Sequence, residues 1–237
     1  MNFALDLKAA DLAPVFAQYG RLHLPGVLSD GDARAVHAAM AVTPWVKSMH
    51  VAGQSYDVAF DELEKLTDDA RADLNAAFLA GGVGEFQFRY DACRISDIYD
   101  VGLEMLGEIS ALGAAYKMLN SAAFLDFVRT LTRDSRPAFA DAQATRFRAG
   151  DFLTAHDDAA AGKNRLYAYV LNLTPAWRTD WGGLLAFHDQ DGHVAEAYSP
   201  VFNALNIFRV PQKHSVTEVA SYATGERLSI TGWIRER

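Results

Sequence analysis

The spacing of apolar residues changes near residue 140 of this 237-residue chain. Before that point, apolar side chains recur every third or fourth residue, which is the period of an amphipathic helix. Beyond it, apolar and polar positions alternate and turn residues interrupt the alternation at short intervals, as in a β-sandwich or barrel. The pattern therefore predicts a helical first part and a β-rich second part.

The first part carries recognisable signals for the start and end of helices. Ser29 and Asp30 are good N-terminal caps for the helix that follows them, and Gly81 and Gly82 end a later apolar stripe. The expected helices cover residues 33–40, 61–79, 101–119 and 121–131, and short strands are expected at 22–24 and 86–90.

The alternating second part predicts a succession of short strands. They are expected at residues 144–148, 152–156, 165–173, 183–188, 193–197, 204–209, 215–219 and 227–234. Neither an internal repeat nor a low-complexity linker divides the chain. We therefore expect a single domain over residues 1–237, of α+β class with a mainly β core, in which residues 1–140 provide helical support and loops.

Composition narrows the possible partners. The net charge of −8 and the pI near 5.3 disfavour direct binding of nucleic acid or of an anionic membrane, which require a basic surface. Cys93 is the single cysteine, so the chain has no internal disulfide, which fits a reducing compartment. The N-terminus does not resemble a targeting segment, and no apolar run approaches the roughly 20 residues of a membrane span. We expect a cytoplasmic protein.

One short motif has the residue types of a metal site. His156 ends the strand expected at 152–156, and Asp158 follows two positions later. Residues two apart on an extended chain face the same side, so this pair can bind one side of a metal ion. His214, at the start of another expected strand, would complete the two histidines and one carboxylate of non-haem Fe(II) oxygenases. A His-x-Asp pair is common, and a capped turn at a strand end is the simpler interpretation of the pair alone.

A second pair on the last expected strand complements the metal motif. Arg227 and Ser229 lie two positions apart, so a guanidinium and a hydroxyl share one face of the strand. Arginine binds carboxylates through a fork of N–H donors. With the metal ligands, this pair describes a site for 2-oxoglutarate, whose far carboxylate would meet Arg227.

Together these motifs resemble those of the Fe(II)/2-oxoglutarate-dependent oxygenases, in particular the prolyl-hydroxylase-like branch. The order is the same: His-x-Asp, a Gly-Gly strand, a distal histidine and then an arginine. The helix expected at 121–131 also looks like a helix that precedes the barrel in this branch. The matching stretches are 146–158 (RFRAGDFLTAHDD), 169–175 (YVLNLTP), 181–187 (WGGLLAF), His214 and 227–229 (RLS).

The resemblance implies a fold, a set of cofactors and an activity. The fold is a double-stranded β-helix, or jelly roll, forming the catalytic core over residues 141–237. Fe(II) would be held by His156, Asp158 and His214, with 2-oxoglutarate and O₂ as cosubstrates and ascorbate as a candidate reductant. The activity would be hydroxylation of a C–H bond of a prolyl residue in a protein. A free amino acid or small metabolite as substrate, and a non-enzymatic module that binds metal or 2-oxoglutarate, are the alternatives.

Two positions depart from the pattern of this family. Phe147 stands where many members have a tyrosine that reaches 2-oxoglutarate, and it lacks the hydroxyl. Asn172 falls where many members have a second tyrosine; its amide can donate a hydrogen bond to the cosubstrate, or it can be a turn residue at a strand end. Both departures concern the details of cosubstrate binding.

Other histidines of the chain are expected to have structural roles. His23, His37 and His50 have no pattern of metal-ligating neighbours, so we interpret them as surface or packing residues. The segment 187–193 (FHDQDGH) has the composition of a second metal site, but Asp-Gly within it is a turn signal. We therefore expect a solvated hairpin there.

The sequence offers few candidates for contact with the substrate. Arg148 and Trp181 are candidate pocket residues, although a solvated strand charge and core packing explain them as well. Residues 46–60 and 159–164 are expected to be loops, and loops outside the metal site select the substrate. The sequence does not indicate an oligomeric state.

Overall fold

The computed structural model describes residues 1–237 apart from 5–7, 83 and 101–105. The helices are α1 (Ala9–Tyr19), α2 (Asp30–Met40), α3 (Phe60–Glu64), α4 (Asp68–Gly81), α5 (Ile95–Asp100), α6 (Leu106–Leu119) and α7 (Ala122–Thr132). The strands are β1 (Arg21–Pro25), β2 (Val46–Val51), β3 (Gln54–Ala59), β4 (Phe88–Cys93), β5 (Phe139–Ala140), β6 (Gln143–Phe147), β7 (Phe152–His156), β8 (Arg165–Asn172), β9 (Leu185–His188), β10 (Val194–Tyr198), β11 (Ala204–Arg209), β12 (His214–Val216) and β13 (Arg227–Arg235).

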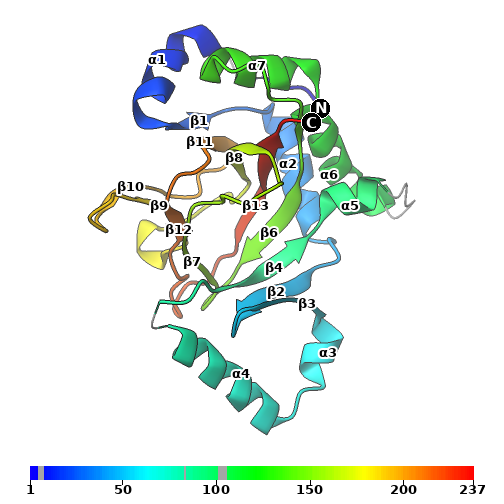
Figure 1. Cartoon of the computed structure of the whole chain (residues 1–237). Helices are drawn as coiled ribbons and strands as arrows, with labels where there is room; N and C mark the ends of the chain where they lie inside the picture. Colours follow the sequence, from blue (N-terminus) through cyan, green and yellow to red (C-terminus); the bar gives the residue numbers. More distant parts are fainter. Residues whose placement is uncertain (5–7, 83, 101–105) are drawn as a thin grey trace.

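The strands form one antiparallel sheet that curls into a nearly closed barrel (Figure 1). Its main path runs β1-β11-β8-β13-β6-β4-β7-β12-β9-β10. Side chains join the two ends of this path, because Arg21 Nε on β1 donates to Glu196 Oε2 on β10 at 2.6 Å. The predicted α+β class, with a mainly β jelly-roll core and supporting helices, is confirmed.

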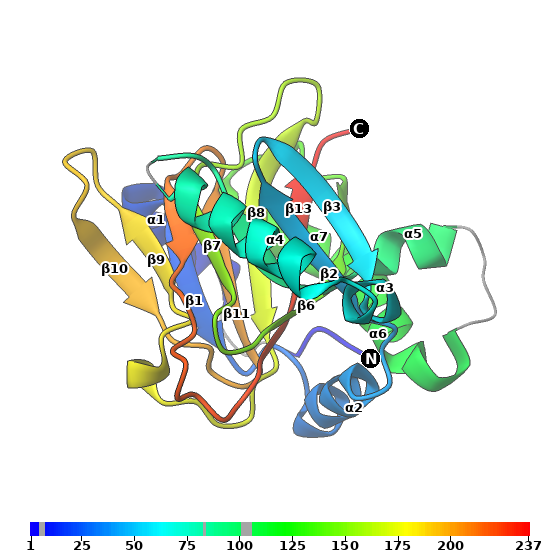
Figure 2. The same ribbon diagram turned by 90° about the horizontal axis from the view of Figure 1, so that it is seen from below.

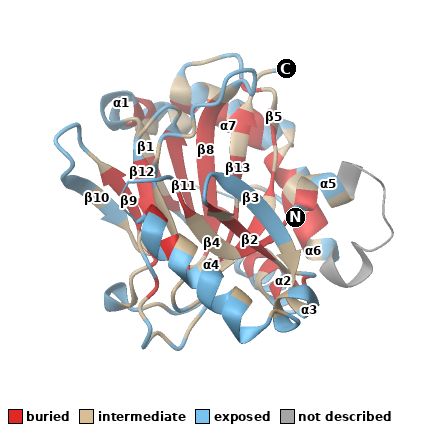
Figure 3. Ribbon diagram, turned by 60° about the horizontal axis from the view of Figure 1, so that its bottom comes forward, coloured by how far each residue is buried: buried red, intermediate tan, exposed pale blue. Residues whose placement is uncertain are grey.

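Helices α1, α2, α6 and α7 cover one side of the barrel and share the largest buried cluster with it. Phe16 of α1, Val36 of α2, Leu112 of α6 and Phe124 of α7 belong to the same buried cluster as Ile230 of β13. The central strands are largely buried, whereas α4 and β3 are largely exposed (Figure 3). Removal of these apolar side chains from water is the main stabilising term that joins the helices to the sheet.

A smaller assembly, formed by β2, β3, α3 and α4, lies at the opposite end of the molecule from α1 and α7 (Figures 1 and 2). It has its own cluster of buried residues, Met49, Val51 and Phe78. The helices therefore do not all lie on one side of the barrel.

Two expectations for this assembly are wrong. The single helix expected at 61–79 is broken into α3 and α4, because the Thr67 side chain accepts a hydrogen bond from the backbone N–H of Ala70 and starts a new helix. The loop expected at 46–60 is the hairpin of β2 and β3, which turns at Ala52 and Gly53 with φ values of 51° and 72°. Left-handed backbone at two successive residues is the geometry of a tight hairpin turn.

The remaining elements lie close to their expected positions. Helices α2 and α7 begin after the caps Ser29 and Ser121, whose hydroxyls accept from backbone N–H groups of the first turn. Part of the helix expected at 101–119 lies outside the described residues, and α6 covers the rest. Helix α1 was not predicted, and Pro14 inside it is a residue that normally argues against a helix. None of the helices described is both long and apolar enough to cross a membrane.

Candidate metal and cosubstrate site

His156 and Asp158 lie at the C-terminal end of β7. His156 is the last residue of the strand, and Asp158 lies beyond it in left-handed backbone with φ of 64°. An aspartate tolerates this conformation better than most residues. The turn brings Asp158 Oδ1 to 3.5 Å from His156 Nε2. The pair therefore meets through a turn, and not through the extended period of two on which the sequence argument relied.

His214 completes the group from the neighbouring strand. As the first residue of β12, it lies directly opposite His156 in the antiparallel pairing with β7. The centroids of the two imidazole rings are 4.2 Å apart, and His214 Nε2 is 3.5 Å from Asp158 Oδ2. One ligand atom from each of the three residues lies within 4.8 Å of the others.

Backbone contacts orient both imidazoles for metal binding. His156 Nδ1 lies 2.9 Å from the carbonyl oxygen of Thr154, and His214 Nδ1 lies 2.8 Å from that of Gln212. A carbonyl only accepts, so each Nδ1 carries the proton and donates it. Each Nε2 then keeps its lone pair for a metal, as in other histidine ligands whose second nitrogen is held by a backbone oxygen.

The protonation states of the group suit a divalent cation. Burial, reinforced by the neighbouring His156, lowers the pKa of His214 to about 4, so this imidazole is neutral at pH 7. Burial alone would raise the pKa of Asp158, but the neighbouring His156 and His214 lower it overall. Two neutral imidazoles and one carboxylate are the donor set of non-haem Fe(II) sites, so these residues fit the iron that the sequence led us to expect.

Arg227 lies deeper in the barrel, at the start of β13. Its side chain is fully buried, and its Nε has no hydrogen-bond partner among the described residues. The guanidinium carbon is 5.0 Å from the centroid of the Phe147 ring, which lies opposite it in register on β6. Burial lowers the pKa of Arg227 to about 10, so the group is still a cation at pH 7, and the described residues provide no anion for it.

Ser229 on β13 and Asn172 on β8 are buried polar residues. Ser229 Oγ is 2.8 Å from Thr145 Oγ1, and Ser229 faces Asn172 across the β13–β8 pairing. The amide of Asn172 donates to the carbonyl oxygen of Ala204 at 3.2 Å, and its Oδ1 has no partner among the described residues. Cosubstrate contacts of these two residues stay predictions.

A cavity of about 640 Å³ joins the three metal-ligating residues to Arg227. Its size is typical of ligand sites. A chain of aromatic contacts along one wall runs from His156 through Phe86, Phe88 and Tyr90 to Phe147, with ring centroids 4.9–5.7 Å apart at each step. Phe86 is 40% exposed and stands at the mouth.

Two expected pocket residues lie elsewhere. Among the described residues, Arg148 and Trp181 do not line this cavity. Arg148 Nε pairs with the buried Asp91 carboxylate at 3.0 Å, and Trp181 packs edge-on against Trp177. Conversely, Tyr90 lines the cavity, although it was not predicted from the sequence. Its signal was the alternation Phe86, Phe88, Tyr90, which puts three aromatic rings on one face of an expected strand.

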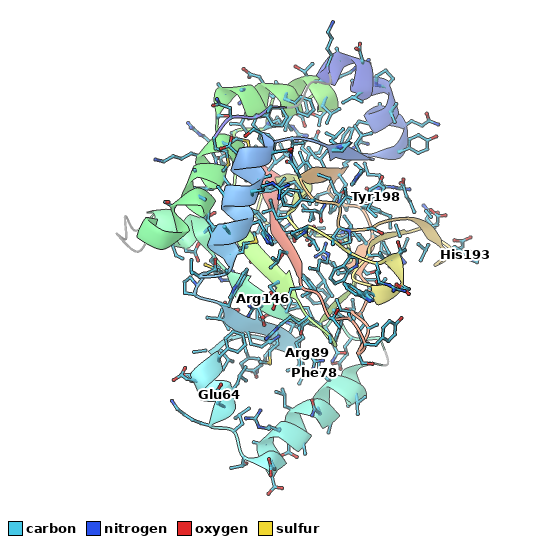
Figure 4. The ribbon with its side chains drawn as sticks, turned by 180° about the vertical axis from the view of Figure 1, so that it is seen from behind. Glu64, Phe78, Arg89, Arg146, His193 and Tyr198 are labelled. Carbon is cyan, nitrogen blue, oxygen red and sulfur yellow. The ribbon has the colours of Figure 1, made fainter. Side chains whose placement is uncertain are left out.

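The alternative metal segment is a hairpin, as predicted. Residues of β9 and β10 pair across it, and His193 lies at its exposed tip, away from the barrel (Figure 4). His188 is engaged with Ser215, with Nε2 and Oγ 2.8 Å apart. His23 lies 2.6 Å from Asn206 Oδ1 and His37 lies 3.0 Å from the Leu173 carbonyl oxygen.

The β-rich part of the chain is similar to known proteins. A family model described as "2OG-Fe(II) oxygenase superfamily" matches residues 142–235. Prolyl 3-hydroxylase OGFOD1 of Mus musculus is 35% identical over 126 residues, 48% of this chain and 22% of that protein. The protein of the same name from Xenopus laevis is 31% identical over 127 residues, 49% of this chain and 24% of that protein. The match thus spans less than a quarter of the length of these curated relatives.

Solved structures share the fold over nearly the whole chain. A prolyl-4-hydroxylase of Pseudomonas putida superposes with a TM-score of 0.60 at 18% identity, covering 98% of this chain and 100% of that one. A prolyl hydroxylase of Trichoplax adhaerens, in complex with a peptide fragment of hypoxia inducible factor, gives 0.61 at 14% identity, covering 96% and 89%.

Proposed function

We propose that the protein is an Fe(II)- and 2-oxoglutarate-dependent dioxygenase, because residues 142–235 match the family model of the 2OG-Fe(II) oxygenase superfamily. The reaction would convert a C–H bond of the substrate, O₂ and 2-oxoglutarate into C–OH, succinate and CO₂. One observation carries the proposal: the cavity lined by His156, Asp158 and His214 is also lined by the buried Arg227, whose Nε has no partner within the described part of the chain.

The residues of the chain would bind and orient the reactants. His156, Asp158 and His214 would hold Fe(II), which with bound 2-oxoglutarate and O₂ supplies the oxidising chemistry. Arg227 would receive the far carboxylate of 2-oxoglutarate through its fork of donors. The apolar walls around them, including Phe147 and Val216, exclude water and strengthen these electrostatic contacts.

For the substrate, we propose a prolyl residue within a protein. The name of the relatives, prolyl 3-hydroxylase, supports this choice. The cavity mouth supports it too, because Phe86 and Tyr56 are about 40% exposed there. Aromatic faces of this kind suit the flat apolar ring of proline, and the open mouth leaves room for flanking peptide. The cytoplasmic location expected from the composition stays a prediction.

The test is formation of succinate that requires Fe(II), 2-oxoglutarate and O₂. His156→Ala and Asp158→Ala should reduce it by at least about a hundredfold, since losing a ligand removes the metal. His193→Ala and Asp191→Ala are matched controls, because this exposed pair (Nε2–Oδ2 distance of 3.9 Å) lies on the hairpin away from the cavity. Full turnover in His156→Ala would refute the assignment.

The substrate class needs a second measurement. Proteins and small molecules of a cell extract are analysed by mass spectrometry after incubation with the enzyme, iron and 2-oxoglutarate. A gain of about 16 Da on prolyl residues, absent with His156→Ala, is the expected outcome. Hydroxylation confined to free amino acids or metabolites would contradict the protein substrate and leave the oxygenase assignment intact.

A further inference from the structure

A row of side chains crosses four strands at the Arg227 end of the cavity. Ser48 on β2 lies opposite Tyr90 on β4, and Phe147 on β6 lies opposite Arg227 on β13. The rings of Tyr90 and Phe147 are stacked, with centroids 4.9 Å apart and planes 22° apart. All four side chains line the cavity. The phenol of Tyr90 on β4 therefore lies one strand away from Phe147 on β6, whose ring has no hydroxyl.

The position of Tyr90 along the cavity shows which end of a ligand it would meet. Tyr90 is separated from His156 by the rings of Phe86 and Phe88. On its other side, Tyr90 is separated from the Arg227 guanidinium only by the ring of Phe147. A contact from Tyr90 would therefore reach the part of a ligand that is remote from the metal.

A carboxylate bound next to Arg227 can accept more hydrogen bonds than one bidentate guanidinium contact provides. A carboxylate has two oxygens with about four acceptor sites, and leaving them unfilled in apolar surroundings is costly. The ring of Phe147 offers none. Thr145 Oγ1 lies 3.4 Å from the Ser229 carbonyl oxygen and 2.8 Å from Ser229 Oγ, so it already has partners. Among the lining residues, Tyr90 and Gln143 bring further polar atoms to this end.

The phenol of Tyr90 is able to donate. Gln143 Nε2 donates to Tyr90 Oη at 3.5 Å, which is a long contact, and a phenol can accept and donate at the same time. Burial raises the pKa of Tyr90, so the O–H proton is retained at neutral pH. The hydroxyl of Ser48 and the charged side chains of Arg94 and Asp57 are also close enough to act on Tyr90.

We propose that Tyr90 Oη donates a hydrogen bond to the far carboxylate of 2-oxoglutarate and so replaces, from β4, the hydroxyl that Phe147 does not supply on β6. Tyr90 is then a positioning residue for the cosubstrate, paired with Arg227 across the intervening ring. This inference rests on the proposed function, because it takes 2-oxoglutarate as the ligand of the cavity.

Equilibrium binding gives a direct test that does not depend on turnover. 2-Oxoglutarate is titrated calorimetrically into the Mn(II)-loaded protein. Tyr90→Phe should raise the dissociation constant by about 10- to 100-fold, which is the effect of losing a hydrogen bond to a charged group. In turnover with Fe(II), the KM for 2-oxoglutarate should rise while kcat changes little. Tyr222→Phe is the control, since Tyr222 is exposed and donates to the Asp180 carbonyl oxygen.

A relocated hydroxyl distinguishes this role from simple packing. The double variant Tyr90→Phe/Phe147→Tyr returns the phenol to β6 and should recover most of the lost affinity. A dissociation constant for Tyr90→Phe within twofold of the wild type would overturn the inference, as would a double variant no tighter than Tyr90→Phe alone. Wild-type protein that fails to bind 2-oxoglutarate would instead overturn the proposed function.

Discussion

Arg227 is the largest fully buried side chain among those the structure describes, and its Nε has no partner there. Transferring a guanidinium from water into the interior costs on the order of several kcal/mol when no anion accompanies it. Without a bound ligand, the protein would be more stable with an apolar residue of similar volume at this position. A ligand carboxylate bound next to Arg227, as proposed above, would offset this cost.

Replacing Arg227 should therefore abolish the binding of 2-oxoglutarate without lowering the stability of the unliganded protein. Arg227→Met removes the unpaired cation, so without ligand its free energy of unfolding should equal or exceed that of the wild type. At 2-oxoglutarate one hundred times its Kd, the Mn(II)-loaded wild type should gain about 2.7 kcal/mol, whereas the variant should gain almost nothing. Chemical denaturation with and without ligand measures both quantities.

An exposed arginine provides the control. Arg178 forms a surface pair with Asp180 at 2.7 Å, so Arg178→Met should keep the stabilisation by ligand. A ligand response in Arg227→Met equal to that of the wild type would show that the carboxylate binds elsewhere.

Strand β4 has a larger role than its six residues suggest. It pairs with β2 on one side and with β6 and β7 on the other, and it contributes Tyr90 to the cavity. Next to Tyr90, Asp91 points to the opposite face and is fully buried. Its carboxylate meets Lys47 Nζ at 2.6 Å, Arg146 Nε at 2.8 Å and Arg148 Nε at 3.0 Å. Asp91 thus ties three strands together behind the site.

Removing the charge of Asp91 should lower the free energy of unfolding. Asp91→Asn leaves three cations with one carboxylate fewer, and removing one partner of a buried ion pair typically costs about 3–5 kcal/mol. Because Asp151 still pairs with Lys47 at 3.1 Å, we expect a loss of about 3 kcal/mol in the free energy of unfolding, measured in guanidinium chloride.

The matched control is an ion pair on a helix surface. Asp126 and Arg129 of α7 form an exposed pair three residues apart, and such pairs contribute about 0–1 kcal/mol. Asp126→Asn should therefore change stability by less than about 1 kcal/mol. An equally small change in Asp91→Asn would mean that Arg146 and Arg148 are stabilised by solvent and not by this carboxylate.

The elements that sequence predicted well are those whose signals are local. The strand carrying His156 was placed to the residue, and the cap of α2 was identified, because alternation and capping act within a few positions. Helix α4 was merged with α3 because the apolar stripe continues across Thr67, and only the capping contact shows the break.

Tyr90 was missed for a different reason. Its strand is adjacent to β6 and β7 in space but about 55 residues away from them in sequence. Pairings of this kind are selected by the whole fold, and no local pattern encodes them. For the same reason, the sequence could place Arg148 on a strand but not show that Asp91 neutralises it away from the cavity.

At the scale of the whole molecule, the helical and β-rich parts share their largest core. The cluster that contains Phe16 and Leu112 continues into Leu171 of β8, Ile207 of β11 and Ile234 of β13. The outer face of the barrel is thus apolar where the helices cover it. The family match begins at residue 142, yet the structural core does not begin there.

This arrangement predicts that the β-rich part does not fold alone. A protein comprising residues 138–237 would expose Leu171, Ile207 and Ile234, each nearly inaccessible to solvent in the full chain, and every buried aliphatic side chain contributes about 1.5–3 kcal/mol. Since a domain is stable by only about 5–15 kcal/mol, losing several such contacts should abolish cooperative folding. Calorimetry and binding of a hydrophobic dye would compare this segment with the full chain. A sharp unfolding transition in the segment would show two independent units and contradict the single domain expected over 1–237.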